Sequence, residues 1–138
     1  MYIRHTLATL TLALTLHAAP QDDQYVLGPD SQVRADVPHG KVTQMPAWAD
    51  SKIFPGTTRD WWIYVPAQYS KDKPAAVMVF CDGGGFVKPD GQFRVPVVFD
   101  NLIAKGEMPV TIAILINPGH KGDNVPESPW RADNRSFE

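Results

Sequence analysis

The chain has 138 residues, of which 43% are hydrophobic and 20% charged, and its formal net charge at pH 7 is −2. This length allows one domain or part of one, and the composition is ordinary for a globular protein. The charge is nearly balanced and contains no basic block, which argues against a nucleic-acid partner. The single cysteine, Cys81, excludes an internal disulfide, and its position after an apolar run predicts a small buried side chain.

Residues 1–19 have the pattern of a secretory signal peptide. Arg4 gives a positive start, residues 7–16 are apolar, and Ala18 and Ala19 offer small side chains for cleavage. The apolar stretch is too short to span a bilayer as a helix. No cysteine lies near the cleavage site. We therefore expect a secreted or periplasmic protein without a membrane anchor after signal cleavage.

The next segment, residues 20–45, is polar and rich in turn-forming glycines and prolines. This composition predicts a linker or an extended lead-in, with a short edge strand over 41–45. A clearer strand is expected over 57–66, where aromatic and β-branched residues dominate and Pro66 ends the run. Its alternation places Trp61, Ile63 and Val65 on one face and Trp62 and Tyr64 on the other.

An uninterrupted apolar run over residues 75–81 stops at Asp82 and three glycines, Gly83, Gly84 and Gly85. Such a run, bounded by turn residues, predicts a strand buried on both faces, as in a parallel sheet. The glycines free the backbone to approach a ligand closely. In open α/β sheets, ligands bind at this end of a strand.

The following residues predict a helix and a second buried strand. Apolar side chains recur with helical spacing from Val95 to Ile103, Pro96 suits the first turn, and Gly106 suits the end. Residues 110–116 are again a strand pattern. A strand, a helix and a strand predict a βαβ unit with parallel strands and hence an α/β fold.

This α/β sheet of about four strands, covered by one helix, would leave one face and one edge bare. We therefore expect residues 46–138 to be the amino-terminal part of a larger domain.

The glycine loop, which we define as residues 82–85, has three possible uses. A phosphate cradle is disfavoured because the chain lacks Gly-x-Gly-x-x-Gly and Gly-Lys-Ser/Thr, and no helix is expected to open directly from the glycines. A plain turn is the simplest use. The third is an oxyanion hole, in which backbone N–H groups bind the negative oxygen of a tetrahedral intermediate. The loop residues alone leave the turn and the oxyanion hole open.

The order of several motifs resembles the enterochelin-esterase-like family, α/β-hydrolases related to feruloyl esterases and esterase D. Arg59 precedes an aromatic strand that ends Tyr-Val-Pro-x-x-Tyr at Tyr69, and the next strand ends in Asp-Gly at residues 82 and 83. Residues 99–106, Pro109 with the strand after it, and residues 134–138 continue the similarity, which covers about 56–138. The resemblance rests on the combination of these motifs in this order.

The resemblance implies an incomplete α/β-hydrolase fold, formed by the amino-terminal strands of a mostly parallel sheet with one crossover helix. It also implies a serine esterase acting on siderophore, feruloyl or acetyl esters, with no cofactor. None of the five serines lies in Gly-x-Ser-x-Gly. The nucleophile, the acid and the histidine are therefore expected after Glu138, and this chain alone is expected to be inactive.

Within the chain, the resemblance leaves Gly83, Gly84 and Gly85 as oxyanion candidates, with Gly84 and Gly85 favoured as donors. Asp82 would fix the turn. Arg131 and Arg135 are candidates for contact with an anionic substrate, although solvated or structural ion pairs that include Glu138 are the favoured interpretation.

Two other classes of protein stay open. One is a non-catalytic secreted module that binds a carbohydrate or peptide through the glycine loop and exposed tryptophans. The other is a metal-dependent hydrolase with Asp82, His120 and Asp123 as ligands, since all three follow the ends of adjacent strands. Three such donors on loops are common by chance. His39 is expected in a turn, and the sequence gives no reason to treat it as a catalytic base.

Overall fold

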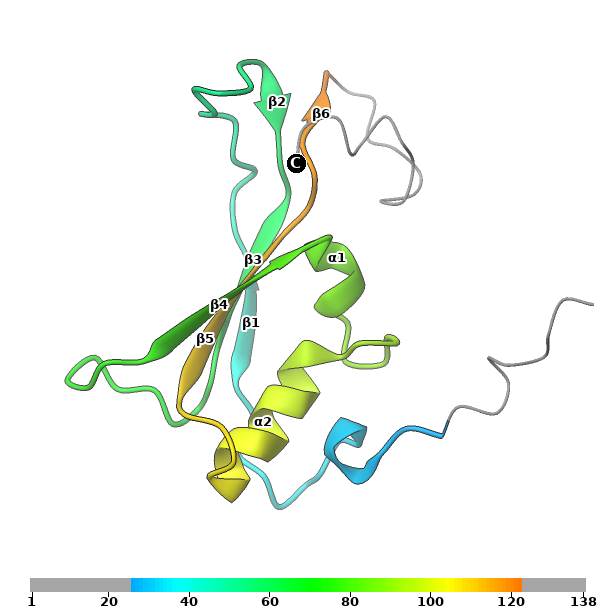
Figure 1. Ribbon diagram of the computed structural model, residues 1–138, viewed down its shortest axis with the longest axis vertical. Helices are drawn as coiled ribbons and strands as arrows, with labels where there is room; N and C mark the ends of the chain where they lie inside the picture. The colour runs from blue at the N-terminus through cyan, green and yellow to red at the C-terminus, as the bar shows by residue number, and fades with distance from the viewer. Residues whose placement is uncertain (1–25, 123–138) are drawn as a thin grey trace, which may run out of the picture.

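The computed structural model describes residues 26–122, which form a small mixed sheet with two helices (Figure 1). A four-stranded sheet has the order β1-β3-β5-β4, and β2 and β6 form a separate two-stranded ribbon. The elements in chain order are η2 (Pro29–Ser31, a 3-10 helix), β1 (Lys41–Gln44), β2 (Thr57–Thr58), β3 (Trp61–Val65), β4 (Ala76–Cys81), α1 (Gly83–Phe86), α2 (Val95–Lys105), β5 (Thr111–Ile116) and β6 (His120–Lys121).

The expected mostly parallel sheet of an α/β-hydrolase is wrong. β4 and β5 are parallel, as the intervening helix predicts, but β3 runs antiparallel to β5 and β1 runs antiparallel to β3. The sheet is therefore mixed, with one parallel pairing out of three. The apolar pattern of a strand is the same for either direction of its neighbour, so the sequence could not reveal the antiparallel pairings.

The strand before the glycine loop is not buried on both faces, contrary to the sequence-based expectation. β4 lies at the edge of the sheet, where Val77 is 61% exposed and Val79 is 58% exposed. Cys81, expected to be buried, is exposed as well. An unbroken apolar run indicates that both faces of a strand are apolar, but it does not show that other elements cover them.

One face of the sheet carries the core. α1 and α2 both lie on this side (Figure 1), and Tyr64 and Leu115 beneath them are completely buried. The ring of Phe99 on α2 packs edge-on against Tyr64, with 5.8 Å between ring centroids. The predicted bounds of α2 are confirmed, because the helix begins at Val95 and ends where Gly106 adopts a left-handed conformation (φ 74°).

The opposite face of the four-stranded sheet is also apolar, and neither described helix covers it. We call it the open face. Between Trp48 and Trp61, two isoleucines complete the walls of an apolar hollow of about 230 Å³. The open face is built from alternating strand positions, namely Trp61, Ile63 and Val65 of β3, Val77 and Val79 of β4, and Ile112, Ile114 and Ile116 of β5.

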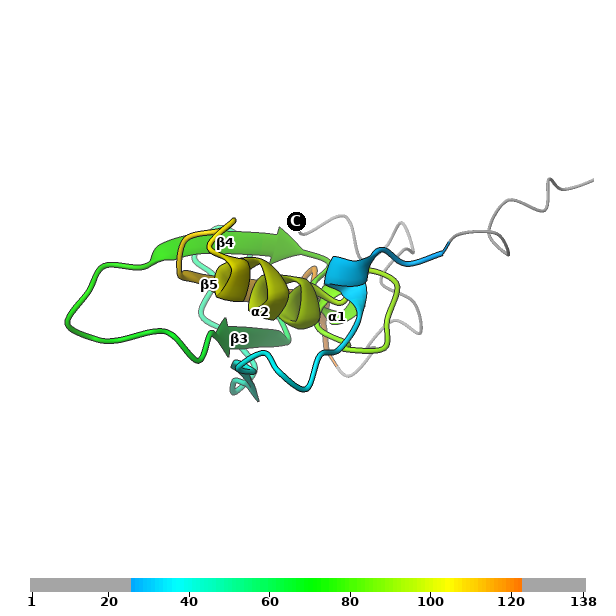
Figure 2. The same cartoon turned by 90° about the horizontal axis from the view of Figure 1, so that it is seen from below.

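In the part of the lead-in before β1 (residues 26–40), η2 packs against α2 (Figures 1 and 2). The Asn101 side chain on α2 donates hydrogen bonds to the backbone carbonyls of Asp30 (2.8 Å) and Gln32 (2.9 Å). Lys105 forms an ion pair with the Asp30 carboxylate. Among residues 26–122, no helix has the length and apolar character needed to cross a membrane.

Candidate functional site

The glycine loop forms a tight turn that leads directly into a short helix. Asp82 adopts a left-handed conformation (φ 59°, ψ 36°), and α1 begins at the next residue. The expectation that no helix opens from the glycines is therefore wrong. Gly83 is buried, and a β-carbon at this position would overlap the backbone of Leu115 and Ile116 in β5. The missing side chain is what lets α1 sit this close to β5.

The N–H groups expected to bind an oxyanion already donate hydrogen bonds within the chain. The Gly84 N–H donates to Oδ1 of Asn117 (2.8 Å), and the Gly85 N–H donates to the carbonyl of Asp82 (2.9 Å). The bond from Gly85 belongs to the turn itself. The bond from Gly84 goes to a side chain, so this N–H becomes available if the Asn117 side chain rotates away.

Asn117 is a residue of this site that the sequence did not single out. It directly follows β5, and its own N–H donates to the carbonyl of Asp60 (2.9 Å), which fixes its backbone beside α1. The one available signal was its position at the end of a strand parallel to β4. The carboxyl ends of adjacent parallel strands meet at the same edge of a sheet.

The other predicted site residues are not brought together in the part of the chain described. Nδ1 of His120 lies 3.1 Å from the carbonyl of Gly122, and residues 26–122 contain no group of three or more His, Cys, Asp or Glu side chains that could hold a metal. Asp123, Arg131 and Arg135 lie outside the described residues, so their suggested roles stay predictions.

A second cluster of polar groups centres on Asp100 of α2, whose side chain is 7% exposed. Its Oδ1 accepts hydrogen bonds from the Tyr64 hydroxyl (2.6 Å) and from the Gly40 N–H (2.8 Å). Its Oδ2 lies 3.2 Å from Nδ1 of His39. We call these four residues the Asp100 cluster. Burial, together with the adjacent carboxylate, raises the pKa of the Tyr64 phenol far above its usual range, so this hydroxyl stays protonated.

The Asp100 cluster borders a pocket of about 390 Å³ between the lead-in, β1 and the start of α2. His39 is about half exposed at its edge. No pattern in the sequence predicts this pairing, because His39 and Asp100 are 61 positions apart and neither belongs to a recognisable motif. The pocket is lined by Val33, His39, Gly40, Val42, Val87, Pro89, Pro96, Val97 and Asp100.

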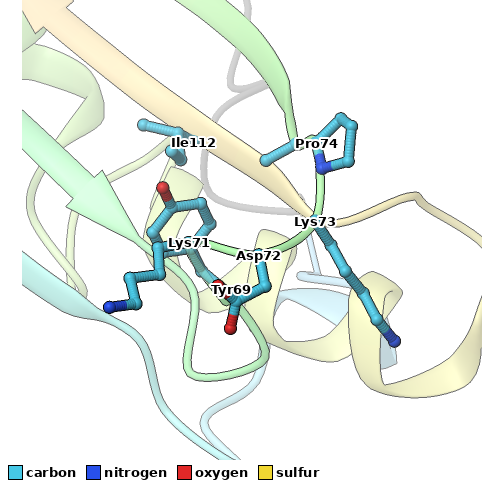
Figure 3. A pocket seen from close by; sticks show the side chains of 7 residues that line it. Tyr69, Lys71, Asp72, Lys73, Pro74 and Ile112 are labelled. Carbon is cyan, nitrogen blue, oxygen red and sulfur yellow. The ribbon is translucent and has the colours of Figure 1, made fainter.

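A third hollow, of about 500 Å³, lies at the other end of the sheet in the loop between β3 and β4 (Figure 3). Its lining includes Tyr69, Asp72 and Ile112. Figure 3 shows Lys71 and Lys73 extending away from each other rather than toward a common point. Convergent polar groups are typical of ligand sites, and this hollow lacks them.

No protein-family model matches the sequence. The glycine loop and the Asp100 cluster are therefore interpreted from their own chemistry.

Proposed function

We propose that this chain carries the oxyanion-binding loop of a secreted carboxylic-ester hydrolase. The observation that supports this proposal is the local geometry of the glycine loop. Asp82 is held in a left-handed conformation, and the next residue, Gly83, packs where no side chain fits. Non-glycine residues in such conformations cost free energy and cluster at functional sites. This turn presents backbone N–H groups at the carboxyl end of β4.

In this proposal, the loop stabilises the negative charge that develops during the reaction. When a serine oxygen attacks an ester carbonyl, negative charge develops on the carbonyl oxygen, and a pre-positioned N–H donor stabilises it in the transition state. In the proposed enzyme, Gly84 supplies one such N–H. In the free protein, Oδ1 of Asn117 occupies the acceptor position (2.8 Å from the Gly84 nitrogen), and the substrate oxygen replaces it.

The remaining catalytic groups come from outside these 138 residues, because no serine here lies in Gly-x-Ser-x-Gly. Within residues 26–122 no strand pairs with the outer edge of β4, and this edge offers a place for the segment that carries them. A strand that adds to this edge in parallel would end next to α1, and a nucleophile after it would lie close to the glycine loop.

The test begins with the native transcript. We expect the reading frame to continue after the codon for Glu138 and to encode Gly-x-Ser-x-Gly, followed by an acidic residue and a histidine. The encoded protein should hydrolyse p-nitrophenyl acetate or the methyl ester of an aromatic acid. A stop codon directly after Glu138 would refute the esterase assignment for this chain.

Three substitutions in that protein then test the loop. Gly84→Pro removes the N–H and should lower kcat by about 100- to 1,000-fold. Gly85→Ala is the matched control, since a β-carbon there meets open space, and it should change kcat little. Asn117→Ala removes the competing acceptor and should leave kcat at or above its original value. An unchanged kcat in folded Gly84→Pro would exclude Gly84 as an oxyanion donor.

A second candidate function is favoured by the hollow between Trp48 and Trp61 on the open face. Trp48 is 40% exposed, and its position beside Trp61 forms an apolar site of the kind that stacks on a sugar ring. Trp62 does not contribute, because it packs against the core on the opposite face. Titration with oligosaccharides distinguishes the two functions: quenching that is lost in Trp48→Ala but kept in Trp62→Phe favours the binding module.

A further inference from the structure

We propose that the pocket beside the Asp100 cluster is a binding site for a small, neutral, apolar hydroxyl compound, with Nε2 of His39 as the hydrogen-bond acceptor. This site is separate from the glycine loop, and the proposal does not depend on esterase activity. The volume of the pocket, about 390 Å³, lies within the range of small-molecule sites in proteins.

The hydrogen bonds of Asp100 determine which nitrogen of His39 carries the proton. An ionised carboxylate can accept hydrogen bonds but cannot donate them. Because Nδ1 of His39 lies 3.2 Å from Oδ2 of Asp100, Nδ1 carries the proton in the neutral imidazole. The other nitrogen, Nε2, then has a free lone pair. Within residues 26–122 the structure gives Nε2 no hydrogen-bond donor.

The cluster also holds the imidazole in place. Asp100 is anchored by the Tyr64 hydroxyl (2.6 Å) and by the N–H of Gly40 (2.8 Å), the residue next to His39. The carboxylate and the histidine backbone are therefore fixed together. A ligand that binds here meets an acceptor that is already oriented, which reduces the entropy lost on binding.

The walls of the pocket select an apolar ligand with no negative charge. Four of the lining side chains are valines, Val33, Val42, Val87 and Val97, and two prolines add further apolar surface. Asp100 also lines the pocket, and its negative charge disfavours an anionic ligand such as a carboxylate. A phenol or an aliphatic alcohol combines an apolar body with one O–H donor for Nε2.

The proposal is tested with three probes of similar shape: 4-ethylphenol, ethylbenzene and 4-ethylbenzoate. Each is titrated into the 138-residue chain, and the imidazole nitrogens of His39 are followed by NMR. We expect 4-ethylphenol to bind about three- to tenfold more tightly than ethylbenzene, which is the range for one net hydrogen bond. It should also shift the Nε2 resonance, while Nδ1 stays protonated.

Two variants distinguish the loss of the Nε2 acceptor from a change in the fold. His39→Asn keeps an N–H that can reach Asp100 but lacks the acceptor at Nε2. The preference for 4-ethylphenol over ethylbenzene should disappear in this variant, with the affinity for ethylbenzene unchanged. His120→Asn, which changes a histidine outside the pocket, should behave like the original chain.

Several results would overturn the proposal. Equal affinity for 4-ethylphenol and ethylbenzene would show that the pocket selects by apolar contact alone. Tightest binding of 4-ethylbenzoate would show that it selects an anion. Absence of binding by all three probes would show that the hollow is not a site for ligands of this class. The Nε2 resonance of the original chain decides the question even if His39→Asn does not fold.

Discussion

At the scale of single residues, the Asp100 cluster joins three segments of the chain through one carboxylate. Gly40 and His39 belong to the lead-in, Tyr64 to β3 and Asp100 to α2. A buried carboxylate is costly unless hydrogen-bond donors compensate for the water it has lost. Here two neutral donors and one imidazole provide that compensation, so each of them stabilises the fold through Asp100.

The first prediction concerns the Tyr64 hydroxyl. Tyr64→Phe leaves the aromatic packing against Phe99 in place but removes one of the donors to Asp100. We expect the free energy of unfolding to fall by about 1–3 kcal/mol, because a buried acceptor loses a partner. Urea denaturation at neutral pH measures the change. Tyr69→Phe is the control, since Tyr69 is 40% exposed and should be within about 0.5 kcal/mol of the original chain.

The same residue gives a pH dependence with a defined sign. The pKa of the Tyr64 phenol is raised in the folded protein, whereas in the unfolded chain it titrates near its ordinary value of about 10. Its contribution to stability is therefore complete below about pH 10 and is lost as the pH rises further. The difference in stability between the original chain and Tyr64→Phe should shrink above pH 10. A difference that grows there would contradict the assignment.

At the scale of secondary-structure elements, the two edges of the sheet differ in chemistry. β1 carries Lys41, Thr43 and Gln44 on an exposed edge, which discourages pairing with another chain. The other edge strand, β4, contains no charged residue or proline between Ala76 and Cys81. An exposed apolar edge of this kind is a template for pairing with a further strand.

The second prediction follows from this asymmetry. Val79→Lys places a charge on β4 at a side chain that is 58% exposed, and it should reduce self-association of the 138-residue chain. Val42→Lys on β1 is the matched control and should have little effect, because that edge is already polar. Light scattering over a range of protein concentrations measures both. Equal effects of the two substitutions would show that β4 is not the associating edge.

At the scale of the whole molecule, the helices within residues 26–122 cover one face of the sheet and leave the other, apolar face without a helix on it. Consecutive side chains of β5 lie on opposite faces of the sheet. Leu115 is completely buried under the helices, whereas Ile114 belongs to the open face. The two side chains are chemically similar and adjacent in sequence. They should nevertheless respond very differently to the same substitution.

The third prediction compares the same substitution at Ile114 and at Leu115. Ile114→Glu should lower the fluorescence of a bound apolar dye, such as anilinonaphthalene sulfonate, and should lower the unfolding free energy less than Leu115→Glu does, because Ile114 is only partly buried. Leu115→Glu should unfold the chain, since an unpaired carboxylate in the core costs several kcal/mol. Circular dichroism and dye binding on the same samples test both. If Ile114→Glu also unfolds the chain, the open face is covered in solution.

Local signals in the sequence were enough to predict α2. Its apolar stripe, Pro96 in the first turn and Gly106 at the end all lie within the helix or next to it. The order and direction of strands in a sheet depend on contacts between residues that are far apart in the sequence. Nothing within residues 75–81 indicates that β4 lies at an edge, or that β3 runs antiparallel to β5.

The same distinction applies to the candidate sites. The glycine loop is visible in the sequence because three glycines follow an apolar run. The bond from Gly84 to Asn117 and the pairing of His39 with Asp100 join residues 33 and 61 positions apart. Such pairings follow from packing of the whole chain, and a single sequence shows no pattern for them.

The long separations within the Asp100 cluster also have a kinetic consequence. The bond between Gly40 and Asp100 closes a loop of 60 positions, and the bond between Tyr64 and Asp100 closes one of 36. Closing a longer loop costs more chain entropy, and this cost comes before the favourable contacts of the closed loop form. β3 and α2 should therefore dock first, and the lead-in should join them late in folding. The pocket beside His39 would then be the last part of the described chain to take shape.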